Sequence, residues 1–363
     1  MRVRSLALLL TAAVTLAFTA VTAPPAAAAT PDRWGFAAVW NPAVPLGTTL
    51  DTTRQWGSWK TAFPALWATG GKQAVGRFQV TFPQVASGTR GTVHVTAVSR
   101  TGNYCEVVRW GSAVADEIVD VACHKPGGVP ADTPFTIMWS TSSGVTPPGA
   151  YATAQVNTAG NAVQWYNSTG AGVPGTGMLT PGRYIVRFPG VGVVGVGLSG
   201  NVQVTAIQPN AVARRCKVES WSPVGLEIDV VVVCVNAAGA PTSTDFFVTY
   251  HRQRAVFGAV DVPKYFGYIW SAGGGQTNYN HQLGFGANAV GMLGVGTYQV
   301  KYPQLGVRET HAQITAYGDG PNYCGLGQPW VYSGPDALVT VMCFDNAGNP
   351  VNYRFLSTFT SRR

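Results

Sequence analysis

The chain has 363 residues and a formal net charge of +8, and only 11% of its residues are charged. Its lysines and arginines are scattered without long runs, whereas a nucleic-acid-binding protein concentrates positive charge along the phosphate backbone. We therefore expect no nucleic-acid partner. The mild basicity suits solubility or attraction to anionic polymers of a cell envelope.

The N-terminus has the pattern of a secretory signal peptide. Arg2 and Arg4 precede an apolar run from Leu6 to Ala23, and an alanine series ends at Ala29. This order predicts a signal peptide over residues 1–29, with cleavage after Ala29. A membrane anchor is the alternative, because the run is nearly long enough to span a bilayer, but no charged stop-transfer cluster follows. No later stretch is long and apolar enough to span, so we expect a secreted, extracellular mature chain.

The rest of the chain repeats one pattern three times. A Gly-x-(Phe/Tyr) segment ends in proline at residues 76–83, 182–189 and 296–303, and each is followed by Val-Thr-Ala or Ile-Thr-Ala and then by cysteine, tryptophan and cysteine. The repeats begin about 110 residues apart, which is the size of a small domain and longer than a solenoid unit. The sequence therefore predicts three tandem domains, at residues 30–144, 145–255 and 256–363.

Within each repeat the apolar residues alternate along the chain. Phe78, Val80 and Phe82 illustrate the period of a strand with one buried face, and helical periodicity is absent after the signal peptide. Each repeat offers six or seven short β-rich segments separated by turns rich in glycine and proline. This pattern predicts an all-β chain of antiparallel β-sandwich domains, Ig-like or jelly-roll-like. A closed barrel is the alternative, because periodicity does not say whether the sheet edges meet.

Six cysteines, two at matched positions in each repeat, indicate one disulfide in each domain. Six cysteines formally allow 15 pairings, and the repeat selects one of them: Cys105 with Cys123, Cys216 with Cys234, and Cys324 with Cys343. An antiparallel hairpin places the two cysteines of each repeat opposite each other, within disulfide distance. Zinc is not expected, because no C-x-x-C pair or repeated histidine completes a tetrahedral site.

These motifs resemble those of the exported multi-repeat β proteins of actinobacteria, which are largely uncharacterised. Their unit runs G-x-Y-x-V-x-F-P, then V-T-A, then C, W and C, and it ends in G-x-P and an aromatic strand. The resemblance covers nearly all of the mature chain. It implies export and this repeated architecture, and it carries no catalytic or ligand-binding residue onto the sequence.

No pattern of titratable residues indicates catalysis or a cofactor. The five histidines never share one matched position in all three repeats, and neither a G-x-S-x-G nor an H-E-x-x-H motif occurs. The carboxylates Asp116, Glu117 and Asp120 suit glycosidase chemistry by type, but the other repeats do not preserve them, so a solvated strand face is the better interpretation. Residues 345–349 resemble part of a calcium loop that lacks the distal acid. We expect no enzyme activity, no metal and no cofactor.

Aromatic residues are the candidate binding groups. Trp110, Trp221 and Trp330 recur in every repeat and are expected to pack in the core. The segments between the opening strand and the Gly-x-(Phe/Tyr) strand vary instead, and variable segments on a constant frame tend to carry recognition. Aromatic rings beside asparagine and glutamine form platforms for sugars. The predicted ligand-binding residues are Trp56, Trp59, Trp165, Tyr166, Trp270 and Tyr279.

The sequence thus predicts a secreted, non-catalytic adhesion protein that recognises extracellular glycan or a cell-envelope polymer through loop aromatics. Three weak sites on one chain multiply into avidity. A structural protein that binds another exported protein is the alternative, and an extracellular hydrolase is a third possibility. Neither the ligand nor the oligomeric state follows from the sequence.

Overall fold

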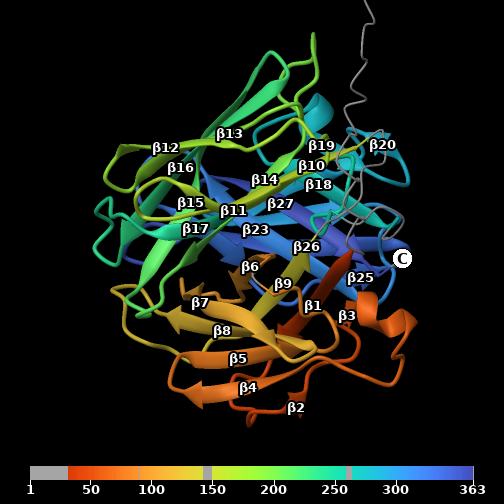
Figure 1. The fold of residues 1–363 in the computed structure, drawn as a ribbon. Coiled ribbons are helices and arrows are strands. Elements are labelled where there is room, and N and C mark those ends of the chain that lie inside the picture. Colours follow the sequence, from red (N-terminus) through yellow and green to blue (C-terminus); the bar gives the residue numbers. More distant parts are fainter. Residues whose placement is uncertain (1–31, 89, 142–148, 259–263, 363) are drawn as a thin grey trace, which may run out of the picture.

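The computed structural model describes residues 32–88, 90–141, 149–258 and 264–362. The predicted signal peptide and the predicted boundary at residue 144 lie outside these ranges. Regular structure in the described residues consists of strands and two short 3-10 helices, η1 (Ser58–Thr61) and η2 (Gly275–Thr277). The all-β prediction is confirmed, and the several sheets are consistent with the predicted β-sandwich domains (Figure 1).

The strands of the first repeat belong to two sheets. The inner sheet has the order β3-β1-β9-β6 and the outer sheet the order β2-β4-β5-β8-β7. Their bounds are β1 (Arg33–Val39), β2 (Thr48–Thr49), β3 (Trp56–Gly57), β4 (Thr69–Ala74), β5 (Arg77–Phe82), β6 (Thr92–Ala97), β7 (Tyr104–Ala113), β8 (Asp116–His124) and β9 (Phe135–Thr141).

The second repeat follows the same plan, with an inner sheet β11-β10-β17-β14 that continues from β14 into β7 of the first repeat as one nine-stranded sheet, and an outer sheet β12-β13-β16-β15 that continues in the same way into the third repeat. Its strands are β10 (Ala150–Val156), β11 (Ala162–Asn167), β12 (Gly175–Thr180), β13 (Arg183–Phe188), β14 (Asn201–Ile207), β15 (Arg214–Val224), β16 (Glu227–Asn236) and β17 (Asp245–Arg252).

The third repeat has an inner sheet β20-β19-β18-β27-β23 and an outer sheet β21-β22-β26-β24, with β25 also paired to β26. The strands are β18 (Phe266–Trp270), β19 (Asn278–Asn280), β20 (Gly284–Phe285), β21 (Ala289–Gly294), β22 (Thr297–Tyr302), β23 (Thr310–Tyr317), β24 (Tyr323–Leu326), β25 (Val331–Ser333), β26 (Asp336–Phe344) and β27 (Arg354–Ser361).

The predicted alternation fills one apolar core in each repeat. Phe78, Val80 and Phe82 on β5 are fully buried between the two sheets of the first repeat, and Tyr184, Val186 and Phe188 on β13 do the same in the second. The third repeat has its own cluster around Trp330 and Phe359. Burial of these side chains stabilises the fold by roughly 1.5–3 kcal/mol each.

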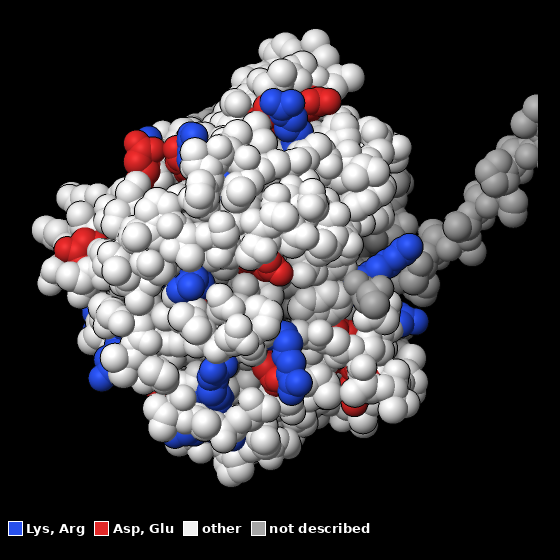
Figure 2. Space-filling model, turned by 60° about the vertical axis from the view of Figure 1, so that its left-hand side comes forward, with Lys and Arg blue, Asp and Glu red and all other residues white. Residues whose placement is uncertain are grey.

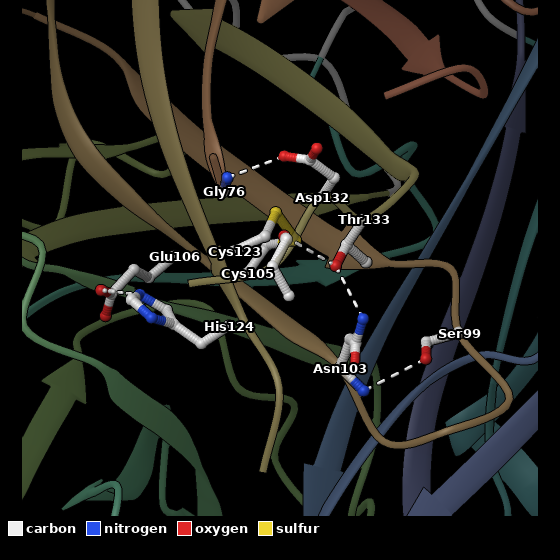
Figure 3. Close-up of a disulfide and its surroundings, with 10 residues drawn as sticks. Gly76, Ser99, Asn103, Cys105, Glu106, Cys123, His124, Asp132 and Thr133 are labelled. Atoms are coloured by element: carbon white, nitrogen blue, oxygen red, sulfur yellow. Dashed lines mark hydrogen bonds and ion pairs between the residues drawn. A yellow bond between two sulfur atoms is a disulfide. The ribbon is translucent and has the colours of Figure 1, made fainter. Parts of the chain in front are cut away.

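The three predicted disulfides are present, and each joins the last strand of an outer sheet to its neighbour: β7 to β8, β15 to β16, and β24 to β26. Figure 3 shows Cys105–Cys123 with the groups that hold its hairpin. The backbone N–H of Cys123 donates to the carbonyl of Gly76 over 2.8 Å, and Asp132 accepts from the Gly76 N–H over 2.9 Å. Gly76 has a φ of 66°, and a Cβ there would lie 2.6 Å from the Cys123 carbonyl oxygen. The repeated glycine is therefore required beside the second cysteine.

The repeats are joined in a cycle by parallel strand contacts. The residue after each Val/Ile-Thr-Ala motif pairs in parallel with the residue two positions after the first cysteine of another repeat. The pairs are Val98 with Leu326, Ile207 with Val107, and Tyr317 with Val218. The first repeat thus contacts the third, the third contacts the second and the second contacts the first, about an approximate threefold axis.

The threonines of the same motif repeat this cycle. Thr96 Oγ accepts from the backbone N–H of Ile314 over 3.1 Å, Thr205 Oγ from that of Val95 over 3.4 Å, and Thr315 Oγ from that of Val204 over 3.1 Å. Each threonine therefore bonds the residue that precedes the matching threonine of another repeat. We call these three bonds the threonine clasp.

The structure corrects one expectation about the strands that carry the clasp. Alternation in these strands predicts one buried and one exposed face, but every residue of β6 and β14 is buried, and so is nearly all of β23. The polar face of each strand lies against the other repeats. His94 is fully buried there and bonds the hydroxyls of Thr205 and Thr249 over 3.0 and 2.8 Å. Burial lowers the pKa of His94 to about 3, with the nearby His311 and His251 adding to the shift. The side chain is therefore neutral at physiological pH.

The surface carries few charges. On the face drawn in Figure 2, charged side chains lie in small groups, several with blue beside red, and wide uncharged areas separate these groups. Exposed cations pair with neighbouring acids, as in Lys301–Asp336 at 2.7 Å and Arg183–Glu219 at 2.6 Å. Such exposed pairs contribute little to stability.

Candidate functional site

The six predicted aromatic residues do not form one surface. Three of them, Trp56, Tyr166 and Tyr279, occupy the same register position on the strand that pairs with the first strand of each repeat: β3 with β1, β11 with β10, and β19 with β18. Trp165 is next to Tyr166 on β11, Trp59 is in η1, and Trp270 ends β18.

Trp59 does not fit the prediction, because its ring is buried. It is only 3% exposed, it belongs to the core cluster of the first repeat, and its indole N–H donates to the Leu66 carbonyl over 3.1 Å. A Cβ at Gly57 would lie 1.8 Å from the ring. The ring fills space that a glycine leaves open, and it offers no face to a ligand.

Trp270 also has a packing role. Its ring lies 5.1 Å from that of Trp221 and 5.1 Å from that of Tyr317, both edge-on. Trp221 belongs to the second repeat, and the other two belong to the third. The three rings fill a boundary between repeats, so Trp270 is not placed as a sugar platform.

The repeated tryptophans contact across the boundaries in the same cyclic order as the clasp. Trp110 lies 6.0 Å from Phe247 of the second repeat, and Trp330 lies 5.6 Å from Trp40 of the first. Trp221 and Trp330 are buried, at 4% and 1% exposed, and Trp110 is half-buried against the core. These tryptophans therefore pack against the cores, as predicted, and they also contact the next repeat.

Strand register makes Trp56, Tyr166 and Tyr279 equivalent. Trp56 pairs with Phe36 on β1, Tyr166 with Thr153 on β10, and Tyr279 with Tyr268 on β18. Following the same row across each sheet reaches residues 94, 203 and 313, which lie two positions before the clasp threonines. All three aromatic side chains are half-buried. The sequence named these residues but not their equivalence, because loops of different length precede them.

The third repeat gathers the largest number of rings around its position. Tyr279 lies 5.1 Å from Phe285 and 5.9 Å from Phe266, and its hydroxyl is 3.2 Å from His281 Nδ1. His281 stacks on Phe266 at 4.9 Å, and Gln282 is exposed and donates to the Lys264 carbonyl. We call Tyr279, His281, Gln282 and Phe285 the third-repeat patch.

The titratable side chains of this patch are neutral and partly buried. Burial raises the pKa of the Tyr279 hydroxyl, and burial together with Lys264 lowers the pKa of His281. Both side chains are therefore uncharged at neutral pH. Phe285 is 43% exposed. Neutral rings beside an amide and a hydroxyl offer an apolar face together with hydrogen-bonding groups.

In the first repeat, cations of the chain itself contact the rings. Trp56 and Trp67 lie edge-on at 6.3 Å; the Arg362 guanidinium is 4.3 Å from the Trp56 ring and Lys60 Nζ is 3.0 Å from the Trp67 ring. Burial lowers the pKa of Lys60. Cation–π contacts of this kind cover one face of a ring.

In the second repeat, Trp165 and Tyr166 point to opposite faces of β11, because successive residues alternate along a strand. Trp165 pairs with the core residue Ala154 at the open edge of the sandwich and is 42% exposed. The Tyr166 ring lies 6.1 Å from Tyr151 on the other face. These two residues therefore do not form a joint platform.

The carboxylates of β8 do not form the expected solvated strand face, because Glu117 and Asp120 are buried, and they have three separate sets of partners. Asp116 accepts from the Gln84 N–H over 3.0 Å, Glu117 from the Ser112 hydroxyl over 2.8 Å, and Asp120 pairs with Arg109. Burial raises the pKa of Glu117 to about 7. Asp345, in the segment that resembles a calcium loop, accepts from the Asn349 N–H over 2.9 Å. Within the described ranges no group of three or more histidine, cysteine, aspartate or glutamate side chains is placed to hold a metal.

No protein-family model, curated protein or solved structure matches this chain. In the part of the chain that the structure describes, no helix has the length and hydropathy needed to cross a bilayer.

Proposed function

We propose that this chain is an exported, non-catalytic binding protein of three β-sandwich domains, at residues 30–144, 145–255 and 256–363, which attaches to extracellular glycan or to a cell-envelope polymer. Its binding groups are the equivalent aromatic side chains Trp56, Tyr166 and Tyr279, and the third-repeat patch is the principal site. Trp59 and Trp270 are not part of it.

The observation that carries the proposal is the repetition of a half-buried aromatic residue at one register position, Trp56, Tyr166 and Tyr279. The clasp explains why polar residues recur on β6, β14 and β23, but it gives no reason for an aromatic ring on β3, β11 and β19. Rings held at one position of a rigid sheet are suited to stack on pyranose rings. Weak sites at three positions on one chain gain avidity on a polymer with repeating units.

Retention on insoluble polysaccharides, followed by a glycan array, tests this proposal. The double variant Tyr279→Ala with Phe285→Ala is expected to lose at least tenfold in retention. Leu226→Ala is the control, because Leu226 is 55% exposed in a turn of the second repeat and remote in sequence from the patch. Equal retention of both variants, or no retention of the folded wild type on any glycan, contradicts the proposal.

A second candidate function is binding to another exported protein, which the outer strands β12 and β21 favour. Both are edge strands of their sheets, both lack charged residues, and they expose Met178, Leu179, Met292 and Leu293 at 44%, 45%, 64% and 61%. The matching strand of the first repeat carries Lys72 and is paired with β2. Uncharged edges of this kind are templates for an added strand. Two results together favour this candidate. The protein is cross-linked to a partner in culture medium, and substitution of Met178 and Met292 abolishes that cross-link; and the wild type is not retained on any glycan.

A further inference from the structure

A cavity lies on the approximate threefold axis, beside the threonine clasp. Its volume is about 70 Å³, and all three repeats line it with the clasp residues Thr96, Thr205 and Thr315 and with the first cysteines, Cys105, Cys216 and Cys324. A cavity needs about 10–15 Å³ to hold one water molecule. This one therefore has room for a small ligand or several waters.

Three side chains that directly precede the first cysteines meet at this cavity. They are Tyr104, Arg215 and Tyr323, and all three line it. The Arg215 guanidinium lies 4.6 Å from the Tyr104 ring and 4.2 Å from the Tyr323 ring, and the two rings are edge-on at 5.6 Å. One matched position thus holds tyrosine in two repeats and a cation in the other.

Arg215 is a buried charge whose donors are only partly used. It is 8% exposed, and its Nη2 donates to Asn346. Among the described residues, Nε and Nη1 of Arg215 and the hydroxyl of Tyr104, which is 5% exposed, have no hydrogen-bond partner. An unsatisfied buried donor costs roughly 1–3 kcal/mol, and more when it is charged.

The nearby charges do not neutralise Arg215. Lys217 also lines the cavity and is 6% exposed, and its Nζ donates to the Asp319 carbonyl over 2.9 Å and to the Tyr353 hydroxyl over 2.7 Å. Glu106, on the strand that carries Tyr104, bonds His124 Nε2 over 3.1 Å and the Arg214 N–H over 2.8 Å (Figure 3 shows the Glu106–His124 pair). Its carboxylate is therefore engaged elsewhere.

We propose that the axial cavity binds a small inorganic anion, held by Arg215 and the Tyr104 hydroxyl, with the positive charge of Lys217 adding to the attraction. A water molecule satisfies a donor but leaves the buried positive charge uncompensated, whereas an anion does both. Burial lowers the pKa of Arg215, and it brings that of Lys217 to about 7 against the opposing effect of Asp319 and Glu219. The bound anion links the first and second repeats at the axis.

Bromide is the probe for the test, because it scatters anomalously and reports its own position. Crystals soaked in sodium bromide are expected to show an anomalous peak in the cavity, in contact with Arg215 and Tyr104. In solution, chloride line broadening in ³⁵Cl NMR is expected for the wild type and is expected to disappear in Arg215→Met, which keeps an unbranched apolar stem without the charge. Arg109→Met is the matched control, because the Arg109 side chain is 74% exposed.

Tyr104→Phe keeps the test informative if Arg215→Met does not fold. This variant retains the ring that stacks on the guanidinium and removes only the hydroxyl, so anion affinity is expected to fall about tenfold, the usual effect of one hydrogen bond to a charged group. A cavity that contains only water in the bromide crystals, or broadening that is unchanged in both variants, overturns the proposal. Displacement of bromide by phosphate or acetate distinguishes an oxyanion site from a halide site.

Discussion

The threonine clasp makes a specific prediction about stability. In Thr315→Val, the buried N–H of Val204 loses its acceptor at 3.1 Å, and Gln203 Oε1 loses a donor at 2.9 Å. Each buried group left unpaired costs about 1–3 kcal/mol, so the free energy of unfolding is expected to fall by about 2–4 kcal/mol. Valine has nearly the shape of threonine, so the loss reports the hydroxyl and not a cavity.

Thr315→Ser is the control for this prediction. It keeps the hydroxyl and removes one methyl group, which costs about 0.8 kcal/mol. Urea unfolding followed by tryptophan fluorescence measures both variants, and matching variants at Thr96 repeat the comparison at the bond to Ile314. If valine and serine destabilise equally, the hydroxyl does not join the repeats and the reasoning is wrong.

Three further predictions concern pH, the disulfides and the repeated glycine. Because burial holds the pKa of His94 at about 3, the unfolded chain binds a proton below about pH 6.5 that the folded chain does not; stability is therefore lost as the pH falls, by about 1.4 kcal/mol per unit. His94→Gln is expected to reduce this loss in urea titrations at pH 7 and pH 5, and an unchanged slope contradicts it. Replacing Cys216 and Cys234 by alanine is expected to lower the unfolding free energy by about 3 kcal/mol through loop entropy; a midpoint equal to that of the wild type refutes this estimate. Gly182→Ala is expected to destabilise more than Gly225→Ala, because a Cβ at Gly182 would lie 2.3 Å from the Thr242 nitrogen, whereas Gly225 has open space; equal melting temperatures count against the argument.

The strands and disulfides were predictable because their signals are local. Alternation in residues 78–82 reflects one core face, and the matched cysteines face each other on adjacent strands, as at Cys105 and Cys123. Both features depend on neighbours within one repeat. A pattern of period two needs no knowledge of the rest of the molecule.

The second buried face of β6, β14 and β23 was not predictable in this way. The residues that cover it come from another repeat, so His94 has the sequence context of an exposed histidine on an amphipathic strand. One signal was present in the aligned repeats: residues 94, 203 and 313 are His, Gln and Gln. Amides and an imidazole at one matched position, without any lysine or glutamate, indicate a polar face that is buried.

The candidate sites were predicted in part. Aromatic residues in the variable segments drew attention to Trp56, Tyr166 and Tyr279, but only strand register aligned them, because the loops before them differ in length. The sequence also contains a signal for the axial cavity. Residues 214–217 read Arg-Arg-Cys-Lys where the other repeats have Asn-Tyr-Cys-Glu and Asn-Tyr-Cys-Gly. Three cations around one disulfide cysteine, in a chain so poor in charge, mark a position where the repeats diverge for a reason other than the shared fold.

The cyclic contacts distinguish the strands that face another repeat from the strands farther from the axis. Strands β6, β14 and β23 end in parallel pairs with another repeat, so their edges are closed by the chain itself. Among the described strands, β3, β11 and β19 pair with no strand of another repeat, and they carry the half-buried aromatic positions; β12 and β21 are the uncharged edges of the outer sheets. Because the clasp fixes the repeats about one axis, the three aromatic positions are held at set distances, and the proposed polymer ligand must match that spacing to engage them together.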